Sequence, residues 1–198
     1  MRFGGIIGIA TDRDPDQRKS IESIRAFSRP DTPIVAIFNG VTPFDLPAGI
    51  EVLSYPNPIG REQGTWKILY NLAIERGWDW ACDFHDDMHL MEAGWEDFIE
   101  AEFKKYPLGL AAYYNWGFLR PHDTNAGHGA TSYSMTSGTP ESAKPDWHLG
   151  VSPDGCGIAY NMELFKRRGF FTNIQAIVGY GEMEAGLWAY EQDWFCCR

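Results

Sequence analysis

The sequence lacks any apolar stretch long enough to cross a membrane, since a spanning helix needs about 20 such residues. Residues 1–10 are apolar, but the polar residues 11–14 end this run, and no signal-peptide layout is present. The four cysteines include no Cys-x-x-Cys pair, and two of them, Cys196 and Cys197, are adjacent near the C-terminus, so neither a zinc knuckle nor a dependable disulfide is indicated. We therefore expect a cytoplasmic protein with reduced thiols.

Basic residues are also scarce: 17 Lys and Arg stand against 27 Asp and Glu, which gives a net charge of −10. Affinity for nucleic acid rests mainly on Lys and Arg that neutralise phosphates, so a large nucleic-acid-binding surface is not expected. An excess of acidic residues is compatible with binding of a divalent cation. The length of 198 residues is typical of one domain, and we expect a single domain over residues 1–198.

Short apolar runs alternate with segments of helical periodicity along the chain. We expect strands at 3–10, 33–38, 50–55, 78–84, 108–116 and 155–160, and helices at 15–28, 64–76, 95–103, 161–169 and from about 182. This alternation predicts an α/β fold in which helices flank a mostly parallel sheet. Residues 121–146 are rich in Gly, Ser, Thr and Pro and predict a long loop, which is either functional or disordered.

A cluster of ionisable residues follows the strand expected at 78–84. It reads Asp83-Phe84-His85-Asp86-Asp87-Met88-His89 and falls at the carboxyl end of the strand, where open α/β sheets bind ligands. Crowded carboxylates are unfavourable unless a cation or a proton offsets their charge, and Asp oxygen with His nitrogen suits Mn²⁺. Asp86, Asp87 and His89 are therefore candidate metal ligands, with His85 as a further candidate. The alternative is a solvated acidic turn.

The same residues carry a resemblance to a known family. The segment from Asp86 to Trp95 resembles the Asp-x-Asp region of family 2 glycosyltransferases, which have the Rossmann-like GT-A fold. Asp87-Met88-His89 resembles the Asp-x-His variant of polypeptide GalNAc-transferases. The cluster has no Asp-x-Asp triplet, so the pair of ligands stays open. The resemblance implies Mn²⁺ or Mg²⁺ and a nucleotide-diphosphate sugar, with a UDP-sugar foremost.

A second stretch downstream resembles the same family. Residues 154–165 are similar to its glycine-rich strand and short helix, and Gly169-Phe170-Phe171 with residues 179–182 resembles its GGF…GxGED stretch. In inverting members the last Asp of that stretch is the general base, but Met183 stands there in this chain. Glu182 and Glu184, on either side of Met183, are the candidates to serve as the base instead. Alternatively, Glu182 merely begins a helix, where its charge is favourable.

Upstream, Gly60 and the helix through Asn71 resemble the family's Gly…Asn helix before the metal strand, which implies that Gly60 and Asn71 contribute to donor binding. The resemblance implies that Thr11, Asp12 and Asn39, at strand ends, hold the nucleoside, and that Asp86 also contacts the donor. It divides the chain into a nucleotide-binding half, about 1–90, and an acceptor half, about 91–198, in which loop 121–146 closes over the donor.

These observations predict a metal-dependent, hexosyltransferase-like enzyme that moves a sugar to an acceptor hydroxyl with inversion. The acceptor stays open among a glycan, a lipid-linked, a protein and a modified-nucleobase acceptor, as does the oligomeric state. One alternative is a glycosyltransferase-like binding module without catalysis, which Met183 favours. Another is a different metal-dependent nucleotide-processing enzyme, such as a nucleotidyltransferase or phosphoesterase. Family members usually continue past the last motif, so it stays open whether the chain is a fragment and whether a further C-terminal part holds the acceptor site.

Overall fold

The computed structural model describes residues 1–10, 16–60, 62–105, 107–112 and 157–169, together with 185, 188–189, 192 and 194–197 near the C-terminus. The helices are α1 (Asp16–Phe27), α2 (Glu62–Arg76), α3 (Trp95–Phe103) and α5 (Met162–Arg168). The strands are β1 (Phe3–Ile9), β2 (Ile34–Asn39), β3 (Ile50–Tyr55), β4 (Trp80–His85), β5 (Leu108–Ala112), β6 (Gly157–Asn161) and β7 (Phe195–Cys197). The predicted alternation of strands and helices is confirmed over this part of the chain.

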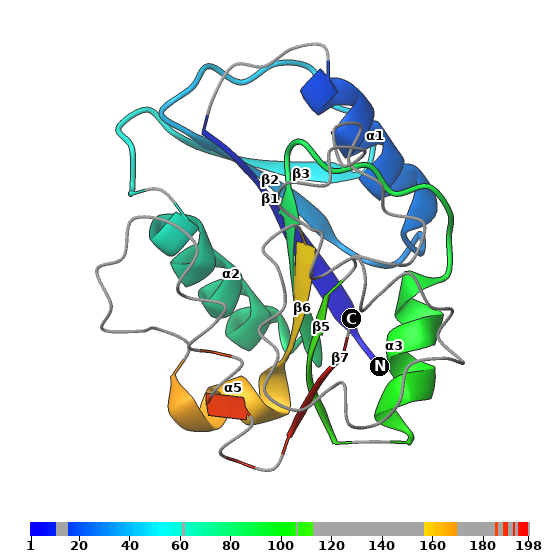
Figure 1. Ribbon diagram of the computed structural model, residues 1–198. Coiled ribbons are helices and arrows are strands. Elements are labelled where there is room, and N and C mark those ends of the chain that lie inside the picture. Colours follow the sequence, from blue (N-terminus) through cyan, green and yellow to red (C-terminus); the bar gives the residue numbers. More distant parts are fainter. Residues whose placement is uncertain are drawn as a thin grey trace, which may run out of the picture.

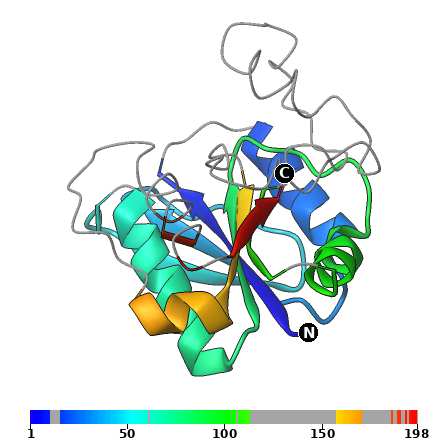
Figure 2. The same cartoon turned by 60° about the horizontal axis from the view of Figure 1, so that its bottom comes forward.

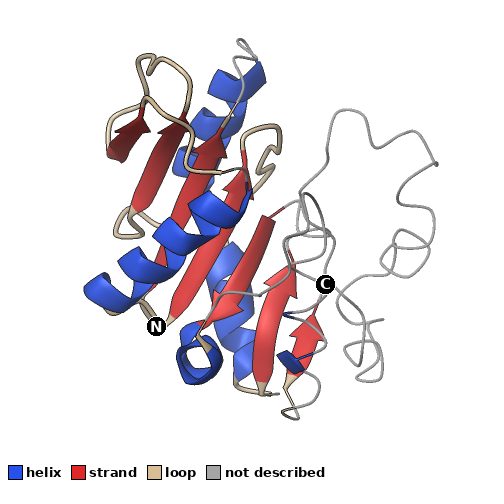
Figure 3. Ribbon diagram, turned by 90° about the vertical axis from the view of Figure 1, so that its left-hand side faces the viewer, coloured by secondary structure: helices blue, strands red, loops and turns tan. Residues whose placement is uncertain are grey.

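The strands form one sheet in the order β3-β2-β1-β4-β6-β5-β7 (Figure 3). Strands β3, β2, β1 and β4 are parallel to their neighbours. Helix α1 connects β1 to β2 and α2 connects β3 to β4, whereas β2 and β3 are joined without a helix. Strand β6 is antiparallel to both β4 and β5, and β7 is parallel to β5. The sheet is therefore mostly parallel with one reversed strand in its second half.

Helices cover both faces of the sheet (Figure 2). On one face Ile21 and Ile24 of α1 pack with Trp95 and Ile99 of α3 in one apolar cluster. On the other face α2 and α5 contribute to a second cluster, which includes Leu69 of α2. Because β1 and β2 lie between these two layers, their side chains are buried on both faces, which explains the continuous apolar runs in the sequence.

Close packing of β1 against the α2 side depends on glycine. A Cβ atom added to Gly4 would lie 2.0 Å from the indole of Trp78, the second residue after α2 ends. At Gly8, near the end of β1, an added Cβ would lie 3.3 Å from Thr65 in the first turns of α2. The glycines of the N-terminal strand thus let α2 and the segment after it approach the sheet.

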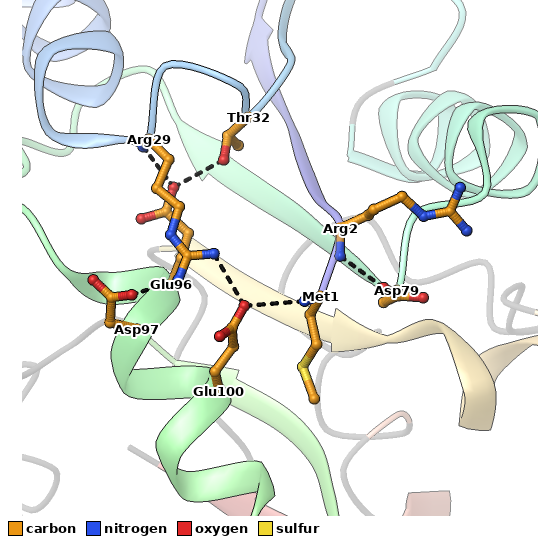
Figure 4. A network of polar contacts seen from close by, with 8 residues as sticks. All are labelled: Met1, Arg2, Arg29, Thr32, Asp79, Glu96, Asp97 and Glu100. Atoms are coloured by element: carbon orange, nitrogen blue, oxygen red, sulfur yellow. Dashed lines mark hydrogen bonds and ion pairs between the residues drawn. The ribbon is translucent and has the colours of Figure 1, made fainter.

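An ion-pair network ties α3 to the segment between α1 and β2 (Figure 4). The Arg29 guanidinium donates to Asp97 and Glu100, and Glu100 also accepts from the N-terminal ammonium of Met1. Glu96 is 1% exposed, and its Oε1 accepts from the Arg29 N–H and the Thr32 hydroxyl. These contacts fix the start of α3 near the amino ends of the parallel strands.

The second half of the chain agrees less closely with the sequence expectations. Strand β7 falls after the helix expected from about 182, and no strand was expected there. Loop 121–146 and most of that helix lie outside the described residues, and the division into two halves stays a prediction. No helix in the described part of the chain is long and apolar enough to span a membrane.

Candidate functional site

The carboxyl ends of β1, β2 and β4 lie at the same edge of the sheet, because these strands are parallel. The helices α1 and α2 follow β1 and β3 and therefore begin at this edge. In such sheets ligands bind beyond the carboxyl ends of the strands. Asn39 is the last residue of β2, and the cluster from His85 to His89 begins at the last residue of β4. The structure thus brings the predicted residues of both strands to one edge.

The residues predicted as metal ligands lie immediately after β4. Asp86, Asp87 and His89 are each half-buried, whereas Met88 between them is 2% exposed. The buried methionine anchors this turn in the apolar cluster that also contains Ile21 of α1. The polar side chains on either side of it are therefore held at the surface of the carboxyl edge.

Helix α1 holds this turn by hydrogen bonds. Gln17 Nε2 donates to Asp86 Oδ2 at 2.5 Å, and the Ser20 hydroxyl donates to the carbonyl of Met88. Gln17 is 1% exposed and Ser20 is fully buried. The backbone of the turn is thereby fixed against the first turns of α1.

A second Asp-x-His pair lies within β4 itself and was not singled out in the sequence. Residues two apart on a strand share a face, so Asp83 and His85 lie on the same face of β4. Asp83 is 7% exposed, and its Oδ2 accepts a hydrogen bond of 2.6 Å from Trp66 Nε1 on α2. This pair could have been found in the sequence, because Asp83-Phe84-His85 has the same Asp-x-His spacing as Asp87-Met88-His89. His85 is half-buried at the end of the strand, nearer to solvent than Asp83.

Asn39 and Gly60 are brought together by direct hydrogen bonds. Asn39 is 4% exposed; its Nδ2 donates to the Gly60 carbonyl at 2.5 Å, and its Oδ1 accepts from the Ile59 N–H at 2.9 Å. Gly60 has a φ of 95°, a conformation that glycine adopts without strain. Asn39 therefore shapes the loop before α2.

Asn71 does not join this group. It is exposed on α2, nine residues after the helix begins at Glu62, and hence roughly 14 Å along the axis from that end. Its neighbours Leu72 and Ala73 are buried against the sheet, so Asn71 lies on the outer face of the helix. Thr11, Asp12, Glu182 and Glu184 lie outside the described residues, and their roles stay predictions.

The donor set after β4 fits a divalent cation that shares its ligands with a phosphate. Within the described residues no three His, Cys, Asp or Glu side chains are grouped closely enough to hold an ion by themselves. Mg²⁺ and similar hard cations are usually bound by one or two carboxylates plus substrate phosphates. The adjacent carboxylates of Asp86 and Asp87, with an imidazole on each side in sequence, provide that chemistry.

The sequence matches no protein-family model and no curated protein. The structure, however, is similar to those of glycosyltransferases. It superposes on a mannosyltransferase from Pyrobaculum calidifontis, in complex with GDP-Man and Mn²⁺, with a TM-score of 0.65 and 12% identity, covering 99% of this chain and 54% of that one. It superposes on residues 1–349 of TarS from S. aureus with a TM-score of 0.63 and 10% identity, covering 99% and 58%.

These similarities establish the fold. The chain has the α/β fold of these glycosyltransferases, which confirms the fold predicted from the sequence. It spans slightly more than half the length of each of the two proteins.

Proposed function

We propose that the chain is a glycosyltransferase that binds a nucleotide-diphosphate sugar with a divalent cation and transfers the sugar to an acceptor hydroxyl. One observation carries the proposal: in a glycosyltransferase fold, two adjacent carboxylates, Asp86 and Asp87, directly follow the strand β4 at the carboxyl edge of the sheet. One neighbour of this fold is described in complex with GDP-Man and Mn²⁺, which is the ligand class that such carboxylates suit.

In this proposal Asp86 and Asp87 hold the cation, with His85 or His89 as the nitrogen ligand. When bound, the cation would supply Lewis-acid stabilisation of the negative charge on the leaving diphosphate. Thr11 and Asp12 would contact the nucleoside beyond the end of β1. Asn39 would contribute through the loop that it holds at Ile59 and Gly60.

Transfer requires a base for the acceptor. Glu182, or Glu184, would take the proton of the acceptor hydroxyl while its oxygen bonds to the anomeric carbon and the bond from that carbon to the diphosphate breaks. A single displacement of this kind inverts the anomeric centre. The proposal therefore predicts an inverted product.

The identity of the donor's nucleobase, uracil or guanine, is a separate part of the proposal. The sequence resemblance puts a UDP-sugar first, whereas the mannosyltransferase of the same fold binds GDP-Man. The first donor assay should therefore include both UDP-sugars and GDP-sugars. The acceptor is a hydroxyl compound whose class an acceptor screen would identify.

Substitution of Asp87 tests the proposal. We expect Asp87→Ala to abolish Mn²⁺-dependent release of nucleoside diphosphate from the donor that wild type uses. Asp31→Ala is the matched control, because Asp31 is an exposed aspartate between α1 and β2, at the opposite edge of the sheet. Full activity of Asp87→Ala would show that Asp87 is not a metal ligand. If wild type releases no nucleoside diphosphate from any donor, the enzymatic proposal is contradicted.

A second function has one observation in its favour. Met183 stands where inverting glycosyltransferases carry their catalytic Asp, which is what a binding module without catalysis would show. Such a module would bind the donor with Mn²⁺ and would release no nucleoside diphosphate. Binding without turnover in the assay above, in the presence of acceptor candidates, would favour this function.

A further inference from the structure

The segment from Asp86 to Glu96 runs alongside α1 in the same direction as the helix. Hydrogen bonds connect α1, and the two residues that follow it, with this segment in order; the pairs are Gln17 with Asp86, Ser20 with Met88, Ser23 with Leu90, Ser28 with Trp95 and Arg29 with Glu96. Figure 1 shows this segment after β4 passing beside α1 before it enters α3. The helix therefore fixes the register of the whole segment.

Gln17 differs from the two serines of α1 in this series. Ser20 and Ser23 bond to backbone atoms, whereas Gln17 bonds to the side chain of Asp86. Its amide is enclosed, since Gln17 is 1% exposed, and a buried amide is costly unless it is hydrogen-bonded. The Gln17 amide is therefore held in a fixed position, and its hydrogen bond orients the Asp86 carboxylate.

The hydrogen bond from Gln17 does not prevent the Asp86 carboxylate from binding a cation. An ionised carboxylate has about four lone-pair sites, so accepting a hydrogen bond from the Gln17 amide is compatible with binding a cation. A neutral donor also leaves the negative charge of Asp86 in place. Outer partners of this kind orient the ligands of metal sites and often determine their affinity.

We propose that Gln17 is a positioning residue that orients Asp86 toward the cation and diphosphate of the donor. This inference rests on the proposed function in one respect, namely that Asp86 contacts a cation. It adds that the cation affinity depends on a buried neutral side chain of α1, outside the cluster of ionisable residues.

The test measures Mn²⁺ affinity directly, by electron paramagnetic resonance of free Mn²⁺, with Mn²⁺ alone and with Mn²⁺ plus UDP or GDP. Gln17→Met keeps the length of the side chain and removes the donor. We expect its Kd for Mn²⁺ to rise roughly 10- to 100-fold, as is typical when an outer partner of a metal ligand is lost. Ser28→Ala is the matched control, because Ser28 directly follows α1 and its hydroxyl bonds to the far end of the same segment, at Trp95. We expect its Mn²⁺ affinity to equal that of wild type.

A double-mutant cycle separates positioning from a general loss of stability. In an Asp86→Ala background, Gln17→Met should cause no further loss of Mn²⁺ affinity, because the group through which it acts is gone. Equal Mn²⁺ affinity of wild type and Gln17→Met would overturn the inference, as would an equal loss in Ser28→Ala. Wild type that binds Mn²⁺ through Gln17 and Asp86 but no nucleotide would contradict the proposed function and support the positioning role. Wild type that binds no Mn²⁺ would overturn both.

Discussion

The indole N–H of Trp66 on α2 donates a hydrogen bond of 2.6 Å to the carboxylate of Asp83 on β4. Both residues are 7% exposed, so this contact satisfies polar atoms at the interface between helix and sheet. Asp83 shares a face of β4 with His85, the last residue of the strand. The contact therefore ties the end of β4, at which the candidate site begins, to helix α2.

Substitution of Trp66 should show the energetic value of this contact. We expect Trp66→Phe to lower the free energy of unfolding by about 1–3 kcal/mol beyond the loss of apolar area, because a buried carboxylate loses a donor. Urea unfolding measures the change. Trp78→Phe is the matched control, since Trp78 is 3% exposed in the same apolar cluster. If the two variants are equally destabilised, the hydrogen bond contributes nothing measurable.

Glu96 should make stability depend on pH in an unusual direction. Burial raises the pKa of this carboxyl above its ordinary value of 4.5. The folded state therefore retains the proton to higher pH than the unfolded state, and stability is lost as pH rises from 4.5 through the folded-state pKa. Glu96→Gln removes this loss and keeps an acceptor for the Arg29 N–H and the Thr32 hydroxyl. We expect its advantage over wild type to grow toward neutral pH.

Two further variants make the Glu96 measurement specific. Glu96→Ala removes the acceptor, so we expect it to be less stable than Glu96→Gln by about 1–3 kcal/mol throughout the pH range. Glu100→Gln should behave in the opposite way to Glu96→Gln, because a hydrogen bond from Arg29 lowers the pKa of the Glu100 carboxyl. Its deficit should be present at neutral pH and disappear as pH falls through the folded-state pKa of Glu100. A Glu96→Gln variant with no pH-dependent gain would contradict the assignment.

Much of the first half of the fold could be predicted from the sequence. The strand at Ile50–Tyr55 and the helix at Trp95–Phe103 have the predicted bounds, and the other elements up to β4 differ by one or two residues at most ends. Strands buried on both faces are short apolar runs, and glycine, proline and charged residues mark where they end. The bounds of these elements could therefore be predicted from residues that are close together in the sequence.

The direction of β6 and the existence of β7 could not be predicted. The apolar pattern of Gly157–Asn161 is the same whether the strand is parallel or antiparallel to β4, because direction depends on the path of the chain before it. The three residues Phe195–Cys197 are too few to show an alternating pattern, and they pair with β5 more than 80 residues earlier. Long-range pairing of this kind leaves no local signal.

The candidate site, too, could be predicted from the sequence only in part. The crowded carboxylates at Asp86 and Asp87 were visible in the sequence, because they are adjacent and directly follow an apolar strand. The contacts of Gln17 with Asp86 and of Trp66 with Asp83 were not, since each joins two elements that only tertiary packing brings together. Asn39 was assigned to the nucleoside, whereas both polar atoms of its side-chain amide bond to the loop at Ile59 and Gly60.

The most direct test of the central claim is the melting temperature of the wild-type chain with UDP- and GDP-sugars, each with and without Mn²⁺. A ligand at about 100 times its Kd stabilises the folded state by about 2.7 kcal/mol. For a chain of this length that corresponds to an increase of about 5 to 11 °C. We predict an increase that requires both Mn²⁺ and one nucleotide sugar and that is absent in Asp87→Ala. No increase with any combination would contradict a donor site at the carboxyl edge of the sheet.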